Sequence, residues 1–175
     1  MFAASASDLP ELAKAARAAY ADHYVHYWDP DDSGRYYMDL SFSLATLTRD
    51  FADRNALLYG ISDADELVGY MKLNRIAETE HCPGLTGMEL EKLYLRAHAV
   101  GRGLGKAAMM LAESLALQAG QPTVWLKVMA ENEATVRFYE ALGFVTRSRF
   151  RIDIPHMKDH MRGMLVMSKS LRPIT

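Results

Sequence analysis

The stretch Glu89-Leu-Glu-Lys-Leu-Tyr-Leu95, followed closely by Val100-Gly-Arg-Gly-Leu-Gly-Lys106, decides the fold of this chain. An apolar run typical of a β-strand ends in a short polar segment, and three glycines then lead into a long segment with apolar residues at helical spacing. Glycine at 101, 103 and 105 lets the backbone turn sharply and lets an anion approach its N–H groups. Because the first N–H groups of a helix are unpaired and its dipole is positive there, the stretch predicts a strand, a phosphate-binding loop and a helix.

The spacing of the glycines narrows the kind of phosphate loop. A P-loop reads G-x-x-x-x-G-K-S/T, and a dinucleotide fingerprint needs G-x-G-x-x-G with a later acidic residue; this loop has neither pattern. Arg102 and Lys106 add positive charge at the same place. On this stretch alone, the alternative that the glycines only form a tight strand-to-helix turn stays open.

A second stretch makes the interpretation more specific. Val124-Trp-Leu-Lys-Val-Met-Ala-Glu-Asn132 precedes Phe138-Tyr139 and Gly143-Phe144. Together the two stretches resemble the signatures of the GCN5-related N-acetyltransferases (GNAT). One signature is a loop of Gln or Arg, two residues, Gly, one residue and Gly or Ala, here at positions 100–105; in the other, a strand leads through Asn to a helix that carries Phe-Tyr and ends at Gly-Phe.

This resemblance implies a fold and an activity. It implies one α/β N-acetyltransferase domain over residues 1–175, with a mixed, mostly antiparallel sheet of six to seven strands flanked by about four helices. The parallel neighbours would be the strands at Met88 and Val124, joined by the loop helix as a crossover, and a thioester arm would insert where they splay. The implied reaction transfers an acetyl group from acetyl-CoA to a primary amine by direct attack in a ternary complex, without a metal.

The resemblance also places the coenzyme along the central strand, the glycine loop and the next helix. The expected coenzyme-binding residues are Leu93, Tyr94, Leu95, Gly101, Arg102, Gly103, Leu104, Gly105, Lys106, Asn132 and Tyr139. Val100 stands where the family usually has Gln or Arg. Backbone N–H groups, with Arg102 or Lys106, would therefore have to hold the coenzyme there.

Acetyl transfer sets three chemical demands: the amine must lose a proton, the tetrahedral oxygen must be stabilised, and the thiolate should receive a proton. Tyr139 is the candidate acid, against the alternative of a buried aromatic. A backbone N–H near Leu95, where the family's strand commonly carries a bulge, is the candidate donor to the carbonyl oxygen. Glu91 and Glu89 are the candidate bases, because their spacing predicts one shared face with Leu93 and Leu95; a water chain without a single base is the alternative.

The acceptor side is predicted from an aromatic segment, Tyr20 to Trp28, and the acidic turn that follows it. The family's first two helices flank the acceptor site, so the expected substrate-binding residues are Tyr24, Tyr27, Trp28 and Asp29. Aromatic faces and carboxylates both attract ammonium groups, which favours a di- or polyamine, while the alternative is a helix end covered by aromatics. Two histidines three residues apart, at 23 and 26, are too few to predict a metal site.

Other acceptors stay open at this point. The stretch Leu67–Leu73 and the central strand most resemble bacterial spermidine/spermine-type acetyltransferases, but Pro155–Arg162 departs from them. The alternatives are a protein N-terminus, an amino acid, an aminoglycoside, or a non-catalytic module that binds acyl-CoA. The presence of Tyr139 and both glutamates favours an enzyme.

Composition is that of one globular domain. The chain has 175 residues and a formal charge of −2, and no clustered basic excess indicates nucleic acid as a partner. Cys82 is the single cysteine, which excludes an internal disulfide and is compatible with a reducing compartment. No signal-peptide pattern begins the sequence and no apolar run approaches the roughly 18 residues of a membrane span, so we expect a cytoplasmic protein. A homodimer is left open.

The remaining pattern predicts the other elements. Asp8 and Ser43 are expected to begin two helices, the second ending at Asn55, and positions 75–87 read as a loop. Further expected elements are strands at 57–61, 67–74, 144–154 and 163–171 and a helix at 103–119.

Overall fold

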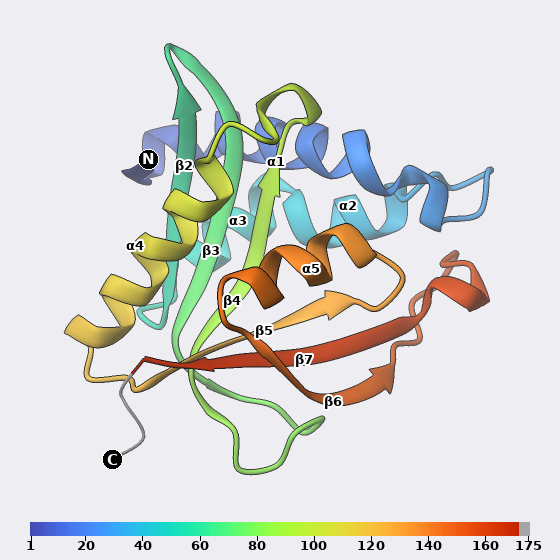
Figure 1. Cartoon of the computed structure of the whole chain (residues 1–175). Helices are drawn as coiled ribbons and strands as arrows, with labels where there is room; N and C mark the ends of the chain where they lie inside the picture. Colours follow the sequence, from blue (N-terminus) through green and yellow to red (C-terminus); the bar gives the residue numbers. More distant parts are fainter. Residues whose placement is uncertain (172–175) are drawn as a thin grey trace.

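A seven-stranded sheet organises the protein (Figure 1). The computed structural model describes residues 1–171. The strands are β1 (Phe2–Ala3), β2 (Ala56–Asp63), β3 (Glu66–Glu78), β4 (Thr86–Leu95), β5 (Thr123–Met129), β6 (Val145–Arg151) and β7 (Gly163–Ser170), in the spatial order β1-β2-β3-β4-β5-β7-β6. The pair β4 and β5 is parallel, and the other neighbouring pairs are antiparallel. The predicted mixed, mostly antiparallel sheet is thus confirmed.

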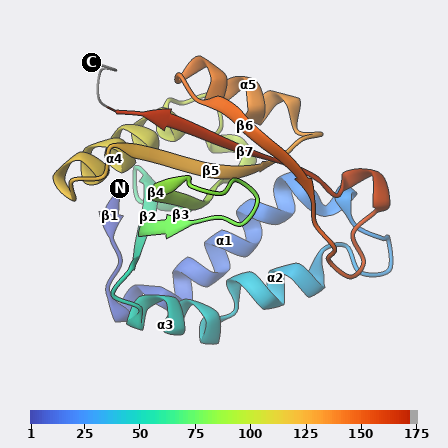
Figure 2. The same cartoon turned by 90° about the horizontal axis from the view of Figure 1, so that it is seen from below.

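Helices cover both faces of the sheet (Figures 1 and 2). On one face lie α1 (Leu9–Tyr24), α2 (Arg35–Phe42) and α3 (Leu44–Ala52), and on the other lie α4 (Leu104–Gln118) and α5 (Glu133–Ala141). The sequence explains how closely α4 approaches the sheet. Ala108, Ala112 and Ala116 recur every fourth residue and are fully buried, so this face of the helix has no long side chains to hold it away.

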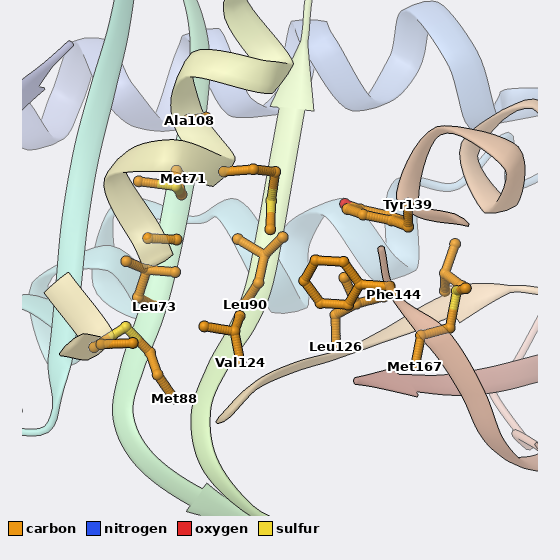
Figure 3. Close-up of a cluster of buried hydrophobic side chains, with 14 of the residues drawn as sticks. Met71, Leu73, Met88, Leu90, Ala108, Val124, Leu126, Tyr139, Phe144 and Met167 are labelled. Carbon is orange, nitrogen blue, oxygen red and sulfur yellow. The ribbon is translucent and has the colours of Figure 1, made fainter. Parts of the chain in front are cut away.

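The core between α4, α5 and the sheet is built from methionine, leucine and valine side chains (Figure 3). Met71, Leu73, Leu90 and Val124 come from three adjacent strands and are nearly inaccessible to solvent. Tyr139 reaches into the same cluster from α5. A second core, on the opposite face, packs α1 to α3 against the sheet. The site described below lies between these two layers, where the sheet opens.

The opening comes from the divergence of β4 and β5. Their parallel pairing covers only Met88–Leu90 against Val124–Leu126, although β4 continues to Leu95 and β5 to Met129. Figure 1 shows the two strands separating beyond the paired segment. The predicted splay is therefore present. On the side of β5, the backbone of the last residues of β4 faces the gap and has no partner strand there.

A bulge in β4 corrects two details of the prediction. The partners of β3 run from Lys72↔Lys92 to Leu73↔Leu90, so Glu91 is the extra residue. The expected bulge near Leu95 therefore lies at Glu91. The bulge also breaks the two-residue alternation: Leu90 and Leu93, three positions apart, pack in the same core, so the expected single face for both glutamates, Leu93 and Leu95 is wrong.

Two elements were not predicted. The short strand β1 pairs Phe2 with Gly60 of β2, and α2 follows the acidic turn with Gly34, at φ +81°, as its cap residue. Ser43 begins α3 as expected and its hydroxyl accepts from Thr46 N–H, but the helix ends at Ala52. The segment expected as a loop at 75–87 is partly strand, because β3 extends to Glu78.

Candidate active site

The glycine loop presents an open backbone at the start of α4. Gly101 and Gly103 both have φ +82°, a left-handed conformation that favours glycine, and Gly103 is the cap residue of α4. A Cβ atom added at either position would meet no protein atom within 4 Å. The space beside this backbone is a cavity, so an anion could approach the unpaired N–H groups of the helix.

This cavity has a volume of about 820 Å³ and is called the larger cavity, because a smaller one adjoins it. It runs from the glycine loop along the end of β4 to the start of α5. Its walls include Leu93, Tyr94, Leu95, Val100, Gly101, Gly103, Gly105, Lys106, Asn132, Phe138 and Tyr139, and on the side of α1 His23, Tyr24, His26 and Tyr27.

Two of the expected coenzyme residues do not line the larger cavity. The Arg102 guanidinium forms an ion pair with Asp63 at the end of β2, so its charge is already engaged there. The side chain of Leu104 packs against the core. Lys106 lines the cavity and is the loop cation that faces it.

The end of β4 offers backbone groups to the gap. Arg96 N–H donates to Val68 O at 2.8 Å, and hydrogen bonds alternate along an antiparallel strand. The N–H and C=O groups of Leu93 and Leu95 therefore point away from β3, toward the space left by β5. The Leu95 carbonyl accepts a hydrogen bond of 2.9 Å from His23 Nε2–H, which ties α1 to this strand end.

A smaller cavity, of about 410 Å³, lies on the other side of the strand end. Four tyrosines form one wall of it: Tyr20, Tyr24, Tyr37 and Tyr94. Their rings pack on one another, with Tyr20 4.8 Å from Tyr24 and 4.9 Å from Tyr37 between centroids. Burial raises the pKa of Tyr20, Tyr24 and Tyr94, and for Tyr24 the raised value is about 12. These hydroxyls therefore stay protonated near neutral pH.

Part of the wall of the smaller cavity is apolar. Phe150, Ile152, Ile154, Met157 and Met164 contribute to it from β6, β7 and the segment between them. His81, from the connection between β3 and β4, stacks on Phe150 with ring centroids 3.6 Å apart and planes at 9°.

The two cavities share six lining residues: Tyr24, Leu93, Tyr94, Asn132, Thr135 and Tyr139. Tyr139 is only 6 % exposed, and burial raises its pKa well above the ordinary value of 10.0. Figure 3 shows its hydroxyl directed from α5 toward β4. A buried, protonated hydroxyl therefore lies at the junction of the cavities.

Asn132 holds the start of α5 at this junction. Its side-chain oxygen accepts from Thr135 N–H at 3.2 Å, so it is the cap residue of the helix. Its amide nitrogen donates to the Tyr24 hydroxyl at 3.4 Å. A cap residue thus connects α5 to the tyrosine wall on α1.

Glu91, at the bulge, is held by two lysines. Burial raises the pKa of this carboxyl, but Lys92 and Lys72 outweigh the effect and hold the pKa at about 2. Lys72 Nζ lies 2.7 Å from Glu91 Oε2 and 3.0 Å from Asp50 Oδ1 on α3, and Lys92 pairs with the other Glu91 oxygen. Glu91 lines the smaller cavity, already neutralised by its neighbours.

Glu89 lies deeper and lines neither cavity. It is 5 % exposed, and Lys127 Nζ lies 3.3 Å from its Oε1. Asn74 connects the two glutamates, because its Nδ2 donates to Glu89 Oε2 at 2.8 Å and to Glu91 Oε2 at 3.0 Å.

The predicted acceptor wall is only partly brought together. Tyr24 lines both cavities and Tyr27 lines the larger one, whereas Trp28 and Asp29 line neither. Trp28 is 1 % exposed and its Nε1–H donates to the Tyr20 hydroxyl at 3.0 Å, which is a packing role. The carboxylate of Asp32 accepts from Tyr36 N–H at the start of α2.

Several lining residues were missed because they come from distant segments. Lys127 and His81 are ordinary charged or polar residues in the sequence, and the methionines at 157 and 164 carry no motif. Only the tertiary arrangement brings them to one cavity. For Lys127, the two-residue alternation of β5 could have predicted a side chain on the face of the sheet opposite to that of Val124. The pattern could not have predicted which face bears the cavity.

Residues 1–171 contain neither a cluster of metal-binding side chains nor a helix suited to a membrane. No group of three or more His, Cys, Asp or Glu side chains in this range is arranged to hold a metal ion. Within the same range, none of the helices is both long enough and apolar enough to span a membrane.

Comparisons with known proteins agree on one family. The model of the family described as "Acetyltransferase (GNAT) family" matches residues 13–144. An uncharacterized N-acetyltransferase of Lactobacillus delbrueckii subsp. lactis is 26% identical over 95% of this chain and 94% of its own length. The peptidyl-lysine N-acetyltransferase YjaB of Salmonella typhimurium is 30% identical over 63% of this chain and 64% of its own.

The fold is shared with a solved structure. The PaiA N-acetyltransferase of Thermoplasma acidophilum, solved in complex with coenzyme A, superposes with a TM-score of 0.72, at 22% identity, over 95% of both chains. At this identity the likeness establishes the fold.

Proposed function

Because the chain belongs to the acetyltransferase (GNAT) family and is an acetyl-CoA-dependent N-acetyltransferase, we propose that it acetylates a primary amine by direct attack in a ternary complex. The observation that carries the proposal is the junction of the two cavities. A donor in the larger cavity and an acceptor in the smaller one would meet beside Tyr94 and Tyr139.

The larger cavity suits acetyl-CoA. Its pyrophosphate would lie at the N-terminus of α4, against the N–H groups after Gly103 and near Lys106. Its extended arm would follow the backbone edge of β4 at Leu93 and Leu95, in the gap left by β5. The Thermoplasma protein of the same fold holds coenzyme A, which supports this assignment.

The chemistry would use groups at the junction. The amine nitrogen attacks the thioester carbonyl, the C–N bond forms, and the C–S bond breaks as the thiolate leaves. Leu95 N–H, directed into the gap, would stabilise the carbonyl oxygen as it becomes negative. The Tyr139 hydroxyl stays protonated at neutral pH and would donate to the leaving sulfur, while the proton lost by the amine balances the one that coenzyme A gains.

For proton removal, a water chain is favoured over a single base. A carboxylate whose pKa is about 2 holds an accepted proton weakly, so Glu91 would be a poor direct base at neutral pH. Glu89 lines neither cavity and could act only through water or through Asn74. The apolar part of the wall disfavours an ammonium ion and the carboxylate on it is already paired, which would favour entry of the neutral amine.

Two acceptor classes have separate support. The polyamine predicted from the sequence keeps its aromatic wall, but the carboxylates at 29, 31 and 32 line neither cavity. A lysine side chain of a protein is a second candidate, since the Salmonella relative bears that activity in its name. Both are primary amines and both are covered by the test below.

The test is an acceptor panel read by thiol release, with the product identified by mass spectrometry. The panel contains alkyl and aromatic amines, polyamines, amino acids, an aminoglycoside and a lysine peptide with a blocked N-terminus. We expect an N-acetylated product of at least one primary amine and stabilisation of the protein by acetyl-CoA. Stabilisation without any acetylated product would indicate a non-catalytic acyl-CoA-binding module instead.

A further inference from the structure

We propose that the acceptor is a hydrophobic monoamine: a primary amine on an aromatic or aliphatic body that carries no second positive charge. This inference rests on the proposed acetyl transfer and assigns the smaller cavity a substrate class. It differs from the polyamine predicted from the sequence, because the residues that line the cavity differ from those expected there.

The first argument is the apolar part of the wall of the smaller cavity. Beyond the junction, an acceptor would contact Phe150, Ile152, Ile154 and Met157. Burying a hydrocarbon body against such side chains is favourable in proportion to its area, whereas burying an ammonium group there without a partner is costly. Methionine side chains adapt to different shapes, so the cavity would accept both flat and branched bodies.

The second argument is charge. Glu91 is the carboxylate that lines the smaller cavity within the described residues, and Lys72 and Lys92 already pair with it. The other charged or titratable groups on the wall, apart from the tyrosines, are Lys92, Lys127 and His81. Lys92 is paired with Glu91, and Lys127 Nζ lies 3.3 Å from Glu89 Oε1, so the charges on this wall are already paired. A second ammonium group would therefore find no free carboxylate there.

The third argument is the proton that the amine must lose. An apolar wall disfavours the charged form of an amine, and no free carboxylate is present to favour it, so both effects keep the pKa of a bound ammonium ion low. For a monoamine, these effects supply the neutral nucleophile that the reaction needs. For a diamine, the same effects act on the second nitrogen as well, so binding is penalised without any gain in reactivity.

The volume of the smaller cavity limits the size of the acceptor. The cavity of about 410 Å³ is near the lower end of the roughly 300–1,000 Å³ typical of small-molecule sites. The stacked rings of His81 and Phe150 lie on its wall and join the β3–β4 connection to β6. We therefore expect acceptors of the size of hexylamine or 2-phenylethylamine.

The test compares two amines of equal length that differ in one terminal group, hexylamine and 1,5-diaminopentane. We expect kcat/KM for hexylamine to be about tenfold higher or more, and 2-phenylethylamine to resemble hexylamine, since replacing a buried methyl group by an ammonium group loses apolar contact and buries a charge without a partner. An equal or higher kcat/KM for the diamine, or for a blocked lysine peptide, would overturn the inference and leave the proposed function intact. If no amine is acetylated although acetyl-CoA stabilises the protein, the proposed function fails and this inference with it.

Two variants separate the apolar argument from the charge argument. Ile154→Ser should lower kcat/KM for hexylamine severalfold and change that for the diamine little, while the exposed control Ile76→Ser should change neither. Lys127→Gln leaves Glu89 without its ion-pair partner and should raise the ratio of kcat/KM for the diamine to that for hexylamine about threefold, whereas the exposed Lys14→Gln should leave this ratio unchanged. Equal effects on both amines in both variants would contradict the proposed recognition.

Discussion

The two cavities that meet at Tyr139 are built in different ways. The larger one is formed by a few stretches that are each contiguous in the sequence: the end of β4, the glycine loop with its open backbone, the start of α5, and residues 23–27 at the end of α1 and just after it. The smaller one is formed by side chains from α1, α2, β4, β5, β6 and β7 and the segments between them. A site made of backbone geometry serves one invariable ligand group, whereas a site made of scattered side chains can change its ligand with each substitution.

The difference predicts where a single glycine matters most. Gly103→Val should weaken acetyl-CoA binding about 100-fold or more, because the side chain forces φ away from +82° and blocks N–H groups whose bonds to a charged ligand are worth about 1.5–3 kcal/mol each. Calorimetric titration measures the effect.

The matched control is Gly120→Val, just after the C-terminal end of α4. Gly120 follows α4, has φ +72° and equally open surroundings, so the strain is similar but no phosphate approaches. Equal losses of affinity in both variants would mean that the glycine loop has only a structural role.

The junction between the cavities should show in kcat and not in donor binding. Tyr139→Phe is expected to lower kcat about tenfold to a thousandfold, as is common for a lost proton donor, with little change in acetyl-CoA affinity. The exposed Tyr36→Phe is the control. Unchanged turnover in Tyr139→Phe, under conditions where chemistry limits the rate, would remove this hydroxyl from the mechanism.

The smaller cavity should depend on its charge network for stability. Glu91→Gln leaves Lys72 and Lys92 without their shared carboxylate and should lower the free energy of unfolding by about 3 kcal/mol at pH 7, while acetyl-CoA affinity changes little. The exposed pair partner Glu11→Gln should cost less than about 0.5 kcal/mol.

The same variant gives a pH test. The pKa of Glu91 is lowered from 4.5 to about 2 in the folded protein, so its contribution to stability is present above about pH 4.5 and is lost as the pH falls toward 2. Urea unfolding at pH 7 and pH 3 should therefore show a smaller difference between wild type and Glu91→Gln at the lower pH. A difference that grows on acidification contradicts the assigned ion pairs.

The smallest expected effect lies within the larger cavity. Lys106→Met should weaken acetyl-CoA binding about twofold to fivefold, because a solvated ion pair contributes about 1 kcal/mol or less. Arg102→Met should have less effect, since this guanidinium is held by Asp63 and does not line the cavity. The affinities of both variants are measured at low and high salt. A larger loss of affinity in Arg102→Met than in Lys106→Met would show that Arg102 turns to the phosphates when the coenzyme binds.

The fold was predictable where the signals are local. The central strand, the loop and α4 follow from one contiguous stretch, and the strand and helix on either side of Asn132 follow from a second one. In contrast, α2 lacks a typical start, because Gly34 precedes it and the carboxylate of Asp32 accepts from Tyr36 N–H. The bulge at Glu91 is a matter of register between two strands, which no single-strand pattern contains.

The candidate site was likewise predictable where its residues follow from local signals. Most of the residues expected to hold the coenzyme line the larger cavity because their positions follow from the loop and strand that define them. The acceptor wall was expected next to the aromatic segment, but Trp28 turned into the core, where its Nε1–H reaches Tyr20. Lys127 and Phe150 are brought to the smaller cavity only by the packing of β5, β6 and β7.

The most direct measurement of the central claim, that the two cavities hold donor and acceptor side by side, is the affinity of a joined ligand. In this conjugate, the nitrogen of the best acceptor in the panel is linked through an acetyl group to the sulfur of coenzyme A. We predict that it binds about 100-fold or more tightly than coenzyme A, because the second site is occupied at high effective concentration, and that coenzyme A carrying only an acetamide group on sulfur gains nothing. A conjugate that binds no better than coenzyme A itself would contradict the account.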